Sequence, residues 1–280
     1  MKKNVIDISD LQKATTLFRS KFGTFLGKKL LKWVCIDKVN KVHANNCHLK
    51  GVAFTTALLK DPLINIRYEV HNKERLENLP EGAFITVSNH PVGSLDGIIL
   101  IDIFTALRPD FRVMVNGVLS HIGAMSDSFI PVRPDSGNQG KNRPNVNGIR
   151  TSLAHLQEGH PMGFFPSGAI SFYRKETKDI RDIDWTHSVI RLIRKANVPV
   201  YPVYFDFYNS RFFYWLGAIS WKIRTLRIPA EVFNKRGKTV HVYIGSPIPA
   251  AEIQQITDEK ELARFLYEKT YELKKITAPL

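Results

Sequence analysis

Short apolar runs alternate with longer helix-like segments along most of this chain, and this alternation limits the possible folds more than any other feature. The short runs are typical of strands, and segments with apolar residues every three or four positions are typical of helices. The predicted strands are 64–70, 83–88, 111–116, 128–132, 162–165, 199–205 and 239–244. The predicted helices are 94–107, 145–158, 184–197 and 257–275. Such alternation predicts the α/β class, with a largely parallel sheet flanked by helices.

The N-terminal part follows a different pattern. Residues 10–60 predict helices, with a polar break at His43-Ala44-Asn45-Asn46. We therefore expect an N-terminal segment of basic amphipathic helices over residues 1–60 and an α/β domain over residues 61–280. The chain contains no run of about 18 uncharged apolar residues, so the sequence predicts no membrane-spanning helix.

The excess positive charge is confined to two segments. The net charge of the chain is +14, of which residues 1–50 carry +8 and residues 207–241 carry the other +6. Both segments also contain many large apolar side chains between the cations, which is typical of helices that lie in a membrane interface. The alternative is that each segment packs its apolar face on the core and exposes a basic face to solvent. A basic chain could also bind nucleic acid, but we find no recognised nucleic-acid motif and predict no such partner.

The two cysteines, Cys35 and Cys47, predict neither a disulfide framework nor a metal site. The start of the chain lacks the apolar core of an export signal, so we expect reduced thiols in the cytosol. His43 and His48 lie nearby, but the spacing of these four residues matches no standard zinc pattern. The sequence therefore predicts no metal.

The segment from Asn89 to Asp96 is the main candidate for chemistry. His90 and Asp96 lie between a predicted buried strand and a predicted helix, in the crevice where α/β sheets bind their ligands. A histidine oriented by a carboxylate is a common general base for a hydroxyl. Gly93 relieves the turn between them. The alternative is that Asp96 only stabilises the helix N-terminus.

Three further segments resemble parts of the same site. Arg133 ends a predicted strand, where it could bind a phosphate or carboxylate or simply form a surface ion pair. Pro166-Ser167-Gly168 follows another predicted strand, and small residues there would let backbone N–H groups approach an anion, although a plain turn is the alternative. The apolar run Val198–Tyr204 is expected to form a wall of the site.

Together these motifs resemble the glycerolipid acyltransferase family of the lysophosphatidate acyltransferase type. The resemblance covers roughly residues 65–250 and matches the family's motifs in order: Asn89-His90…Asp96, Phe129-Ile130…Arg133, Phe165-Pro166-Ser167-Gly168 and Val198-Pro199-Val200. The chain is most similar to the bacterial branch often labelled hemolysin-like, some of whose members O-acylate hydroxyacyl amino-acid lipids such as ornithine or glycine lipids. The resemblance implies that residues 61–280 form the acyltransferase domain.

The departures from the family pattern bear on the acceptor. Five residues separate His90 from Asp96, where four are common in the family, and the arginine motif is one residue longer than usual. The Glu-Gly-Thr-Arg of phosphate-binding relatives is replaced by Ser167-Gly168-Ala169-Ile170. An acceptor without phosphate, such as a lyso-aminolipid, is therefore favoured, and 1-acylglycerol-3-phosphate is the alternative.

The resemblance implies acyl transfer from a thioester to a lipid hydroxyl, with His90 as base and Asp96 as its partner. Asn89, Gly93, Arg133, Pro166, Ser167 and Gly168 are the expected substrate-binding residues. We expect no bound cofactor, with acyl carrier protein or coenzyme A carrying the acyl group. The positive charge favours the acidic carrier protein. The expected location is the cytoplasmic face of the inner membrane, as a peripheral protein. A serine esterase is the enzymatic alternative, but the chain has no Gly-x-Ser-x-Gly.

Overall fold

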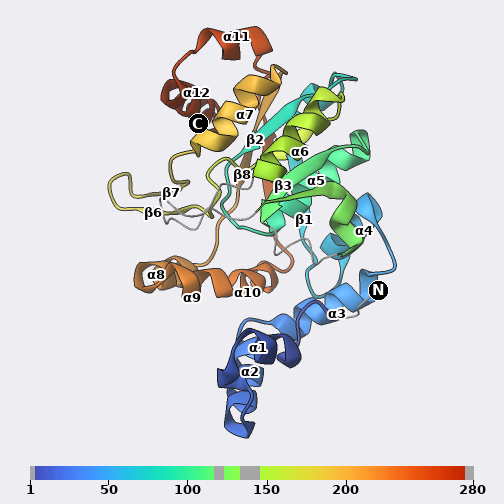
Figure 1. Ribbon diagram of the computed structural model, residues 1–280, viewed down its shortest axis with the longest axis vertical. Coiled ribbons are helices and arrows are strands. Elements are labelled where there is room, and N and C mark those ends of the chain that lie inside the picture. Colours follow the sequence, from blue (N-terminus) through green and yellow to red (C-terminus); the bar gives the residue numbers. More distant parts are fainter. Residues whose placement is uncertain (1–3, 117–122, 133–145, 275–280) are drawn as a thin grey trace.

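A sheet of seven strands forms the centre of the computed structural model, which describes residues 4–116, 123–132 and 146–274 (Figure 1). The strand order is β1-β9-β8-β2-β5-β3-β4. The strands are β1 (Arg67–His71), β9 (Thr239–Ile244), β8 (Val200–Asp206), β2 (Ile85–Ser88), β5 (Met162–Phe164), β3 (Arg112–Asn116) and β4 (Phe129–Val132). All neighbours are parallel except β8 and β9. The predicted α/β class is confirmed, and each predicted strand is present.

Helices cover both faces of the sheet, as the predicted class requires. One face is covered by α4 (Gly51–Lys60) and α5 (Leu95–Leu107), and the other by α6 (Val146–Gln157), α7 (His187–Ala196), α11 (Ala250–Gln255) and α12 (Glu259–Glu272). α5 is apolar on nearly every side because it lies between the sheet and α4. α7 has a strongly one-sided pattern, with Val189, Ile190, Leu192 and Ile193 buried and basic residues outside.

The N-terminal helices are α1 (Ile8–Ala14), α2 (Lys21–Trp33), α3 (Ile36–Asn46) and α4, with a short 3-10 turn, Thr16–Phe18, after α1. The predicted polar break at 43–46 is wrong, because α3 continues through Asn46 and the chain leaves the helix at Cys47. The burial of His43 and Asn46 explains the difference: their side chains face inward, and Asn46 donates to a carboxylate oxygen of Asp61 at 3.2 Å.

α4 is attached to the main core, although it lies within the predicted N-terminal segment. Three hydroxyl groups, from Thr55 and Thr56 of α4 and from Tyr68 of β1, donate to the buried carboxylate of Asp102 on α5. Phe54 and Leu59 are buried in the same cluster as the sheet. The division of the chain after residue 60 therefore stays a prediction.

A second group of helices follows β8 at the end of the sheet where β2 and β8 end. These are α8 (Arg211–Ile219), α9 (Trp221–Leu226) and α10 (Ile228–Phe233), which Figure 1 shows in a row beside the projecting α1 and α2. Arg227 joins the two groups, because it donates to the carbonyl oxygen of Trp33 at 2.6 Å and lies over its ring. The two basic segments of the sequence therefore meet. None of the helices described here is long and apolar enough to span a bilayer.

The remaining short elements were not predicted. They are the antiparallel pair β6 (Phe172–Arg174) and β7 (Asp179–Arg181), and 3-10 turns at Lys73–Leu76 and Gly123–Ser128. The β6–β7 pair matters for the site because it leads directly into Asp182, whose carboxylate accepts a hydrogen bond from the backbone N–H of the predicted catalytic histidine, His90.

Candidate active site

The end of β2 is fixed to the end of β8 by one side chain. Asn89 follows β2, and its amide both donates to the carbonyl oxygen of Phe205 at 3.0 Å and accepts from the N–H of Phe205 at 2.7 Å. The amide thus extends the pairing of two neighbouring parallel strands. This places the next residue, His90, in the crevice at the strand ends, as predicted. The role of Asn89 in substrate binding stays a prediction, since its side-chain amide is hydrogen-bonded to the backbone of Phe205.

The turn after His90 is built around the carboxylate of Asp96, which is 1% exposed. One carboxylate oxygen accepts from the N–H groups of Val92 and Gly93 at 3.0 and 3.1 Å, and the other from the N–H of Gly97 at 2.9 Å. Gly97 lies in the first turn of α5, where helical N–H groups have no partner within the helix, and Val92 and Gly93 lie in the turn before it. Asp96 therefore stabilises the N-terminal end of α5, as the structural alternative predicted, and it also contacts His90.

Gly93 is required by both conformation and space. Its φ of +101° lies in a region that other residues rarely adopt. A Cβ atom at this position would lie 2.6 Å from the side chain of Ile170. The turn between His90 and Asp96 is therefore packed directly against the Pro-Ser-Gly segment that the sequence assigned to the same site.

His90 and Asp96 face each other, as the sequence predicts. Nδ1 of His90 lies 3.1 Å from Oδ2 of Asp96, and the imidazole is 18% exposed. The ring N–H is not aligned with the oxygen as a hydrogen bond requires, which is common for catalytic pairs without substrate. Because Nδ1 faces the carboxylate, Nε2 is the nitrogen left for a substrate proton.

The pKa values of the pair are displaced in opposite directions. Burial by itself lowers the pKa of His90, but the charge and contact of Asp96, with the charge of Asp182, outweigh burial and hold the pKa above its ordinary value. Burial by itself raises the pKa of Asp96, but the contact with His90 and the N–H groups of Val92 and Gly93 hold it below its ordinary value. The arrangement therefore stabilises an imidazolium next to a carboxylate, which a general base needs after it has taken a proton.

Asp182 is a second buried carboxylate at the site, and the sequence analysis missed it. It accepts from the backbone N–H of His90 at 3.1 Å, from the hydroxyl of Ser171 and from the indole N–H of Trp185. Burial raises its pKa. In the sequence, Asp182 lies in a segment where charged and apolar residues are mixed, from Arg181 to Trp185. This pattern does not distinguish a buried aspartate from one at the surface.

The segment from Pro166 to Ser171 lies against the histidine. The ring of Phe165 lies 4.3 Å from that of His90, and the N–H of Ser171 donates to the carbonyl oxygen of His90 at 2.8 Å. Ser167 is buried and donates to the carbonyl oxygen of Ala169 at 2.8 Å. The structure thus brings this predicted motif to the His–Asp pair, as expected.

The backbone N–H groups of two glycines at the site, Gly168 and Gly93, already have hydrogen-bond partners. Gly168, at φ +63°, donates to the carbonyl oxygen of Phe165 at 3.0 Å, and Gly93 donates to Asp96. In this arrangement neither N–H is available to an oxyanion, so these two glycines shape the turns around the site. Their roles in substrate binding, and those of Pro166 and Ser167, stay predictions.

The chain is similar to known acyltransferases over almost its whole length. A model of the family described as "Acyltransferase" matches residues 11–278. The chain belongs to this acyltransferase family. The family predicted from the sequence is confirmed, and so is the prediction that the protein is an enzyme that transfers acyl groups.

Two curated relatives of the acyltransferase carry the same name, lyso-glycine lipid O-acyltransferase. The one from Bacteroides thetaiotaomicron is 30% identical over 258 residues, which cover 89% of this chain and 90% of the relative. The one from Phocaeicola vulgatus is 27% identical over 278 residues, which cover 96% and 95%. Among solved structures, the 1-acyl-sn-glycerophosphate acyltransferase of Thermotoga maritima matches with a TM-score of 0.49 and 14% identity, over 81% of this chain and 83% of that one.

A buried charged network contacts the turn between His90 and Asp96 of the acyltransferase from the side of α8–α10. Asn209 directs its amide N–H groups at the carbonyl oxygens of Pro91 and Val92, both at 3.3 Å. Its own amide oxygen accepts from Nζ of Lys235 at 2.7 Å, and Lys235 pairs with Glu231 at 3.2 Å. Residues 91–93 are therefore held on one side by Asp96 and on the other by this network.

Both charges of the network are almost completely buried, with Lys235 3% and Glu231 1% exposed. Burial lowers the pKa of Lys235. For Glu231, burial raises the pKa, but the N–H of Ser210 and the charge of Lys235 prevail and hold it below its ordinary value. The sequence analysis assigned no role to Lys235 or Glu231.

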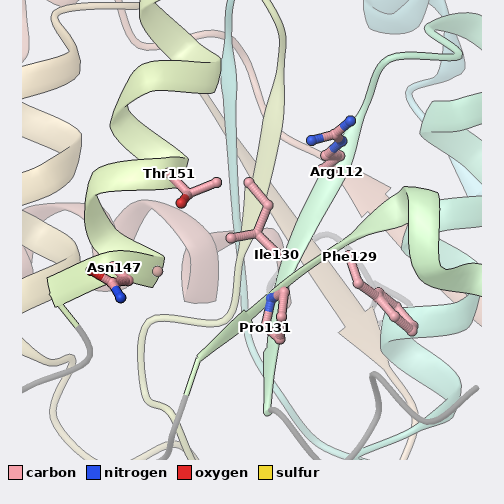
Figure 2. Close-up of a pocket in the computed structure, with 7 residues that line it drawn as sticks. Arg112, Phe129, Ile130, Pro131, Asn147 and Thr151 are labelled. Atoms are coloured by element: carbon pink, nitrogen blue, oxygen red, sulfur yellow. The ribbon is translucent and has the colours of Figure 1, made fainter.

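The predicted substrate ligand Arg133 lies outside the described residues. Among the described residues, a surface pocket between β4 and α6 is lined by Arg112, Phe129, Ile130, Pro131, Asn147, Gly148 and Thr151 (Figure 2). Figure 2 shows Arg112 and Thr151 on opposite sides of Ile130. None of the residues lining this pocket belongs to the His–Asp turn or to the Pro166–Ser171 segment.

Proposed function

We propose that this enzyme transfers a fatty acyl group from a thioester to the hydroxyl of a lysolipid, in membrane lipid biosynthesis. The observation that carries the proposal is the contact between Nδ1 of His90 and the buried carboxylate of Asp96, which leaves Nε2 free at the half-buried face of the ring. Membership of the acyltransferase family supports the reaction class. No step requires a bound cofactor.

In the proposed reaction, Nε2 of His90 takes the proton of the acceptor hydroxyl as its oxygen attacks the thioester carbonyl carbon. The new C–O bond gives a tetrahedral oxyanion, whose collapse breaks the C–S bond. The thiolate leaves and receives the proton from His90, so that the products are an ester and a free thiol. Asp96 holds the ring by Nδ1 and stabilises the imidazolium between these steps.

The proposed acceptor is a lyso-aminolipid, and lyso-glycine lipid is the specific candidate. Two curated relatives with this named acceptor match over most of both chains. The segment Ser167-Gly168-Ala169-Ile170 contains no cation and satisfies its serine hydroxyl internally, which suits an acceptor without a phosphate group. Lysophosphatidate remains the alternative acceptor. For the donor, we propose acyl carrier protein, with coenzyme A as the alternative carrier of the thioester.

We further propose that the enzyme binds the cytoplasmic face of the inner membrane peripherally, through α2, α8 and α9. The two basic segments contain eleven exposed large apolar side chains. These are Leu17, Phe22, Phe25, Leu26, Trp33, Phe212, Trp215, Ile219, Trp221, Ile223 and Leu226. Their exposure contradicts the alternative in which these side chains pack on the core. Aromatic side chains beside lysine and arginine are favoured at an anionic bilayer surface.

The catalytic proposal is tested with purified enzyme, acyl carrier protein loaded with a fatty acid, and each lysolipid in mixed micelles. His90→Ala is expected to lower turnover by at least about 10²-fold. His187→Ala is the matched control, since it removes an exposed histidine from α7 that also faces a carboxylate. A folded His90→Ala protein with normal turnover would refute the mechanism. Lysophosphatidate as the faster acceptor would refute the aminolipid proposal and leave the mechanism intact.

The membrane proposal is tested by flotation with vesicles that contain anionic phospholipid. Trp221→Glu should weaken binding, because Trp221 is 66% exposed beside Lys222 and a carboxylate would meet the same anionic surface. Leu107→Glu is the matched control, as Leu107 is also exposed but lies at the far end of α5. Equal flotation of the two variants would contradict the assigned surface.

A further inference from the structure

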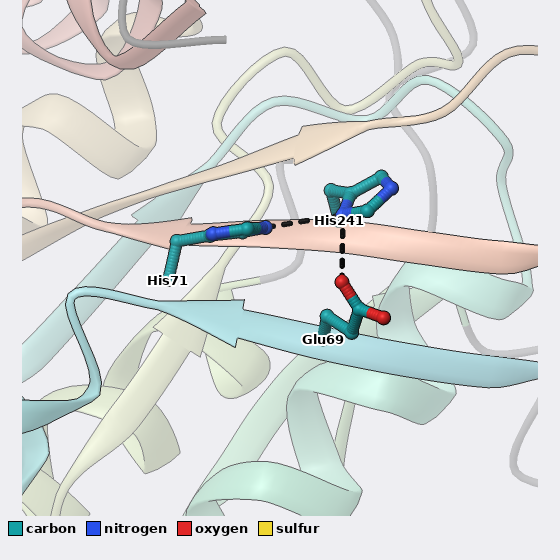
Figure 3. A group of neighbouring side chains, drawn as sticks. All are labelled: Glu69, His71 and His241. Carbon is teal, nitrogen blue, oxygen red and sulfur yellow. Dashed lines mark hydrogen bonds and ion pairs between the residues drawn. The ribbon is translucent and has the colours of Figure 1, made fainter.

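Three metal-ligating side chains meet on the edge of the sheet, outside the site described above. Glu69 and His71 lie two positions apart on β1, so their side chains share one face of the strand. His241 lies opposite Glu69 on the neighbouring strand β9. Figure 3 shows His241 in contact with both. Within the described part of the chain, this is the one group of three His, Cys, Asp or Glu residues close enough to share an ion.

The separations between the donor atoms are close to those of a tetrahedral site. Nε2 of His71 lies 3.0 Å from Nδ1 of His241, which lies 3.4 Å from Oε2 of Glu69. All three donor atoms lie within 4.8 Å of one another. Zinc binds imidazole nitrogen and carboxylate oxygen at about 2.0–2.2 Å, which at tetrahedral angles puts neighbouring ligand atoms about 3.3–3.5 Å apart. Each of the three separations lies within about 1.3 Å of that range.

The surroundings hold the two imidazoles in position. The ring of His71 stacks on that of Tyr243, with 4.3 Å between centroids and 9° between planes. His71 and His241 are half-buried, whereas Glu69 is 63% exposed and leaves the group open to solvent. Without an ion, the short distance between the imidazoles corresponds to a hydrogen bond in which one ring donates to the other.

We propose that Glu69, His71 and His241 bind Zn²⁺, with water in the remaining position. Two imidazoles and a carboxylate form a ligand set that zinc commonly takes. The ion would join β1 to β9 at the edge of the sheet. Because β1 is an edge strand that pairs, among the described strands, only with β9, the ion would stabilise this pairing and so raise the melting temperature. The proposal depends on no part of the proposed reaction.

The experiment uses the full chain with any affinity tag removed and treated with a chelator. Titration with ZnCl₂ is followed by calorimetry, with the bound metal counted by mass spectrometry after gel filtration, and by thermal unfolding. We expect one zinc per chain and a higher melting temperature with zinc. His71→Ala and His241→Ala should abolish both effects. Glu69→Gln, at an exposed position, should weaken binding by at least about tenfold and leave the melting temperature of the metal-free protein unchanged.

His160→Ala is the matched control, because His160 also contacts a carboxylate, Asp110, at 2.8 Å, and lies beside a second histidine. It should bind zinc as the original chain does. The proposal is overturned if the original chain retains no zinc, or if the three variants at the sheet edge bind it as well as His160→Ala does. Circular dichroism of each metal-free variant separates loss of the site from loss of the fold.

Discussion

The buried pair of Lys235 and Glu231 allows a quantitative prediction. Lys235→Met removes the cation and leaves a carboxylate that is 1% exposed. Breaking a buried ion pair by removing one partner costs about 3–5 kcal/mol. Glu231 retains three donors, the N–H and hydroxyl of Ser210 at 2.7 and 2.8 Å and the amide of Asn234 at 3.1 Å. We therefore expect the lower end, a loss of about 3 kcal/mol in the free energy of unfolding.

The loss is measurable by urea unfolding, followed by circular dichroism and tryptophan fluorescence. With a slope of about 3 kcal/mol per M urea, the midpoint falls by about 1 M. The double variant Glu231→Gln/Lys235→Met should lose less than the two single variants summed, because the second change removes the uncompensated charge. Arg264→Met is the matched control: Arg264 pairs with Glu268 at the same four-residue spacing and 3.1 Å, but both are exposed, so little change is expected. Equal midpoints for Lys235→Met and Arg264→Met would refute the reasoning.

Three further predictions concern the proposed catalytic turn. Because the charge of Asp96 raises the pKa of His90, kcat/KM should fall as the pH decreases through a value above 6.5. Asp96→Asn should move this acidic limb of the pH-rate profile to lower pH and reduce turnover by about 10²–10⁴-fold. Asp182→Asn should move the same limb to lower pH by a smaller amount, because the charge of Asp182 also raises the pKa of His90 and its carboxylate accepts from the backbone N–H of His90. An unchanged limb would show that Asp182 does not influence the titration of His90. Gly93→Ala, with a strained φ and a Cβ against Ile170, should lower the free energy of unfolding by about 1–3 kcal/mol and reduce activity, and an unchanged urea midpoint would contradict the strain.

The strands, the main helices and the His–Asp pair could be predicted because each depends on local pattern. The apolar run before Asn89 and the periodic run after Ser94 mark a strand and a helix, and the pair between them must lie at the strand end. The polar break at 43–46 was wrongly predicted because polarity alone does not distinguish a loop from a helix whose His43 and Asn46 face inward.

The residues that the sequence analysis missed depend on contacts between distant segments. Asp182 meets His90 across 92 positions, and Lys235 reaches Asn209 across 26. His71 and His241 are 170 positions apart and meet only because β1 pairs with β9. No local pattern specifies such contacts, since a buried lysine and a surface lysine look alike in a single sequence.

The network around Asn209 also connects the proposed membrane surface to the proposed catalytic turn. Ser210 caps α8 and is held by Glu231 of α10, while the preceding residue, Asn209, holds the carbonyl groups of Pro91 and Val92. A displacement of α8–α10 against the sheet would therefore move the turn that carries His90, the proposed general base. Lys235→Met should then lower turnover even at urea concentrations where the variant remains folded. If its turnover per folded molecule equals that of the original chain, the network supports the fold alone.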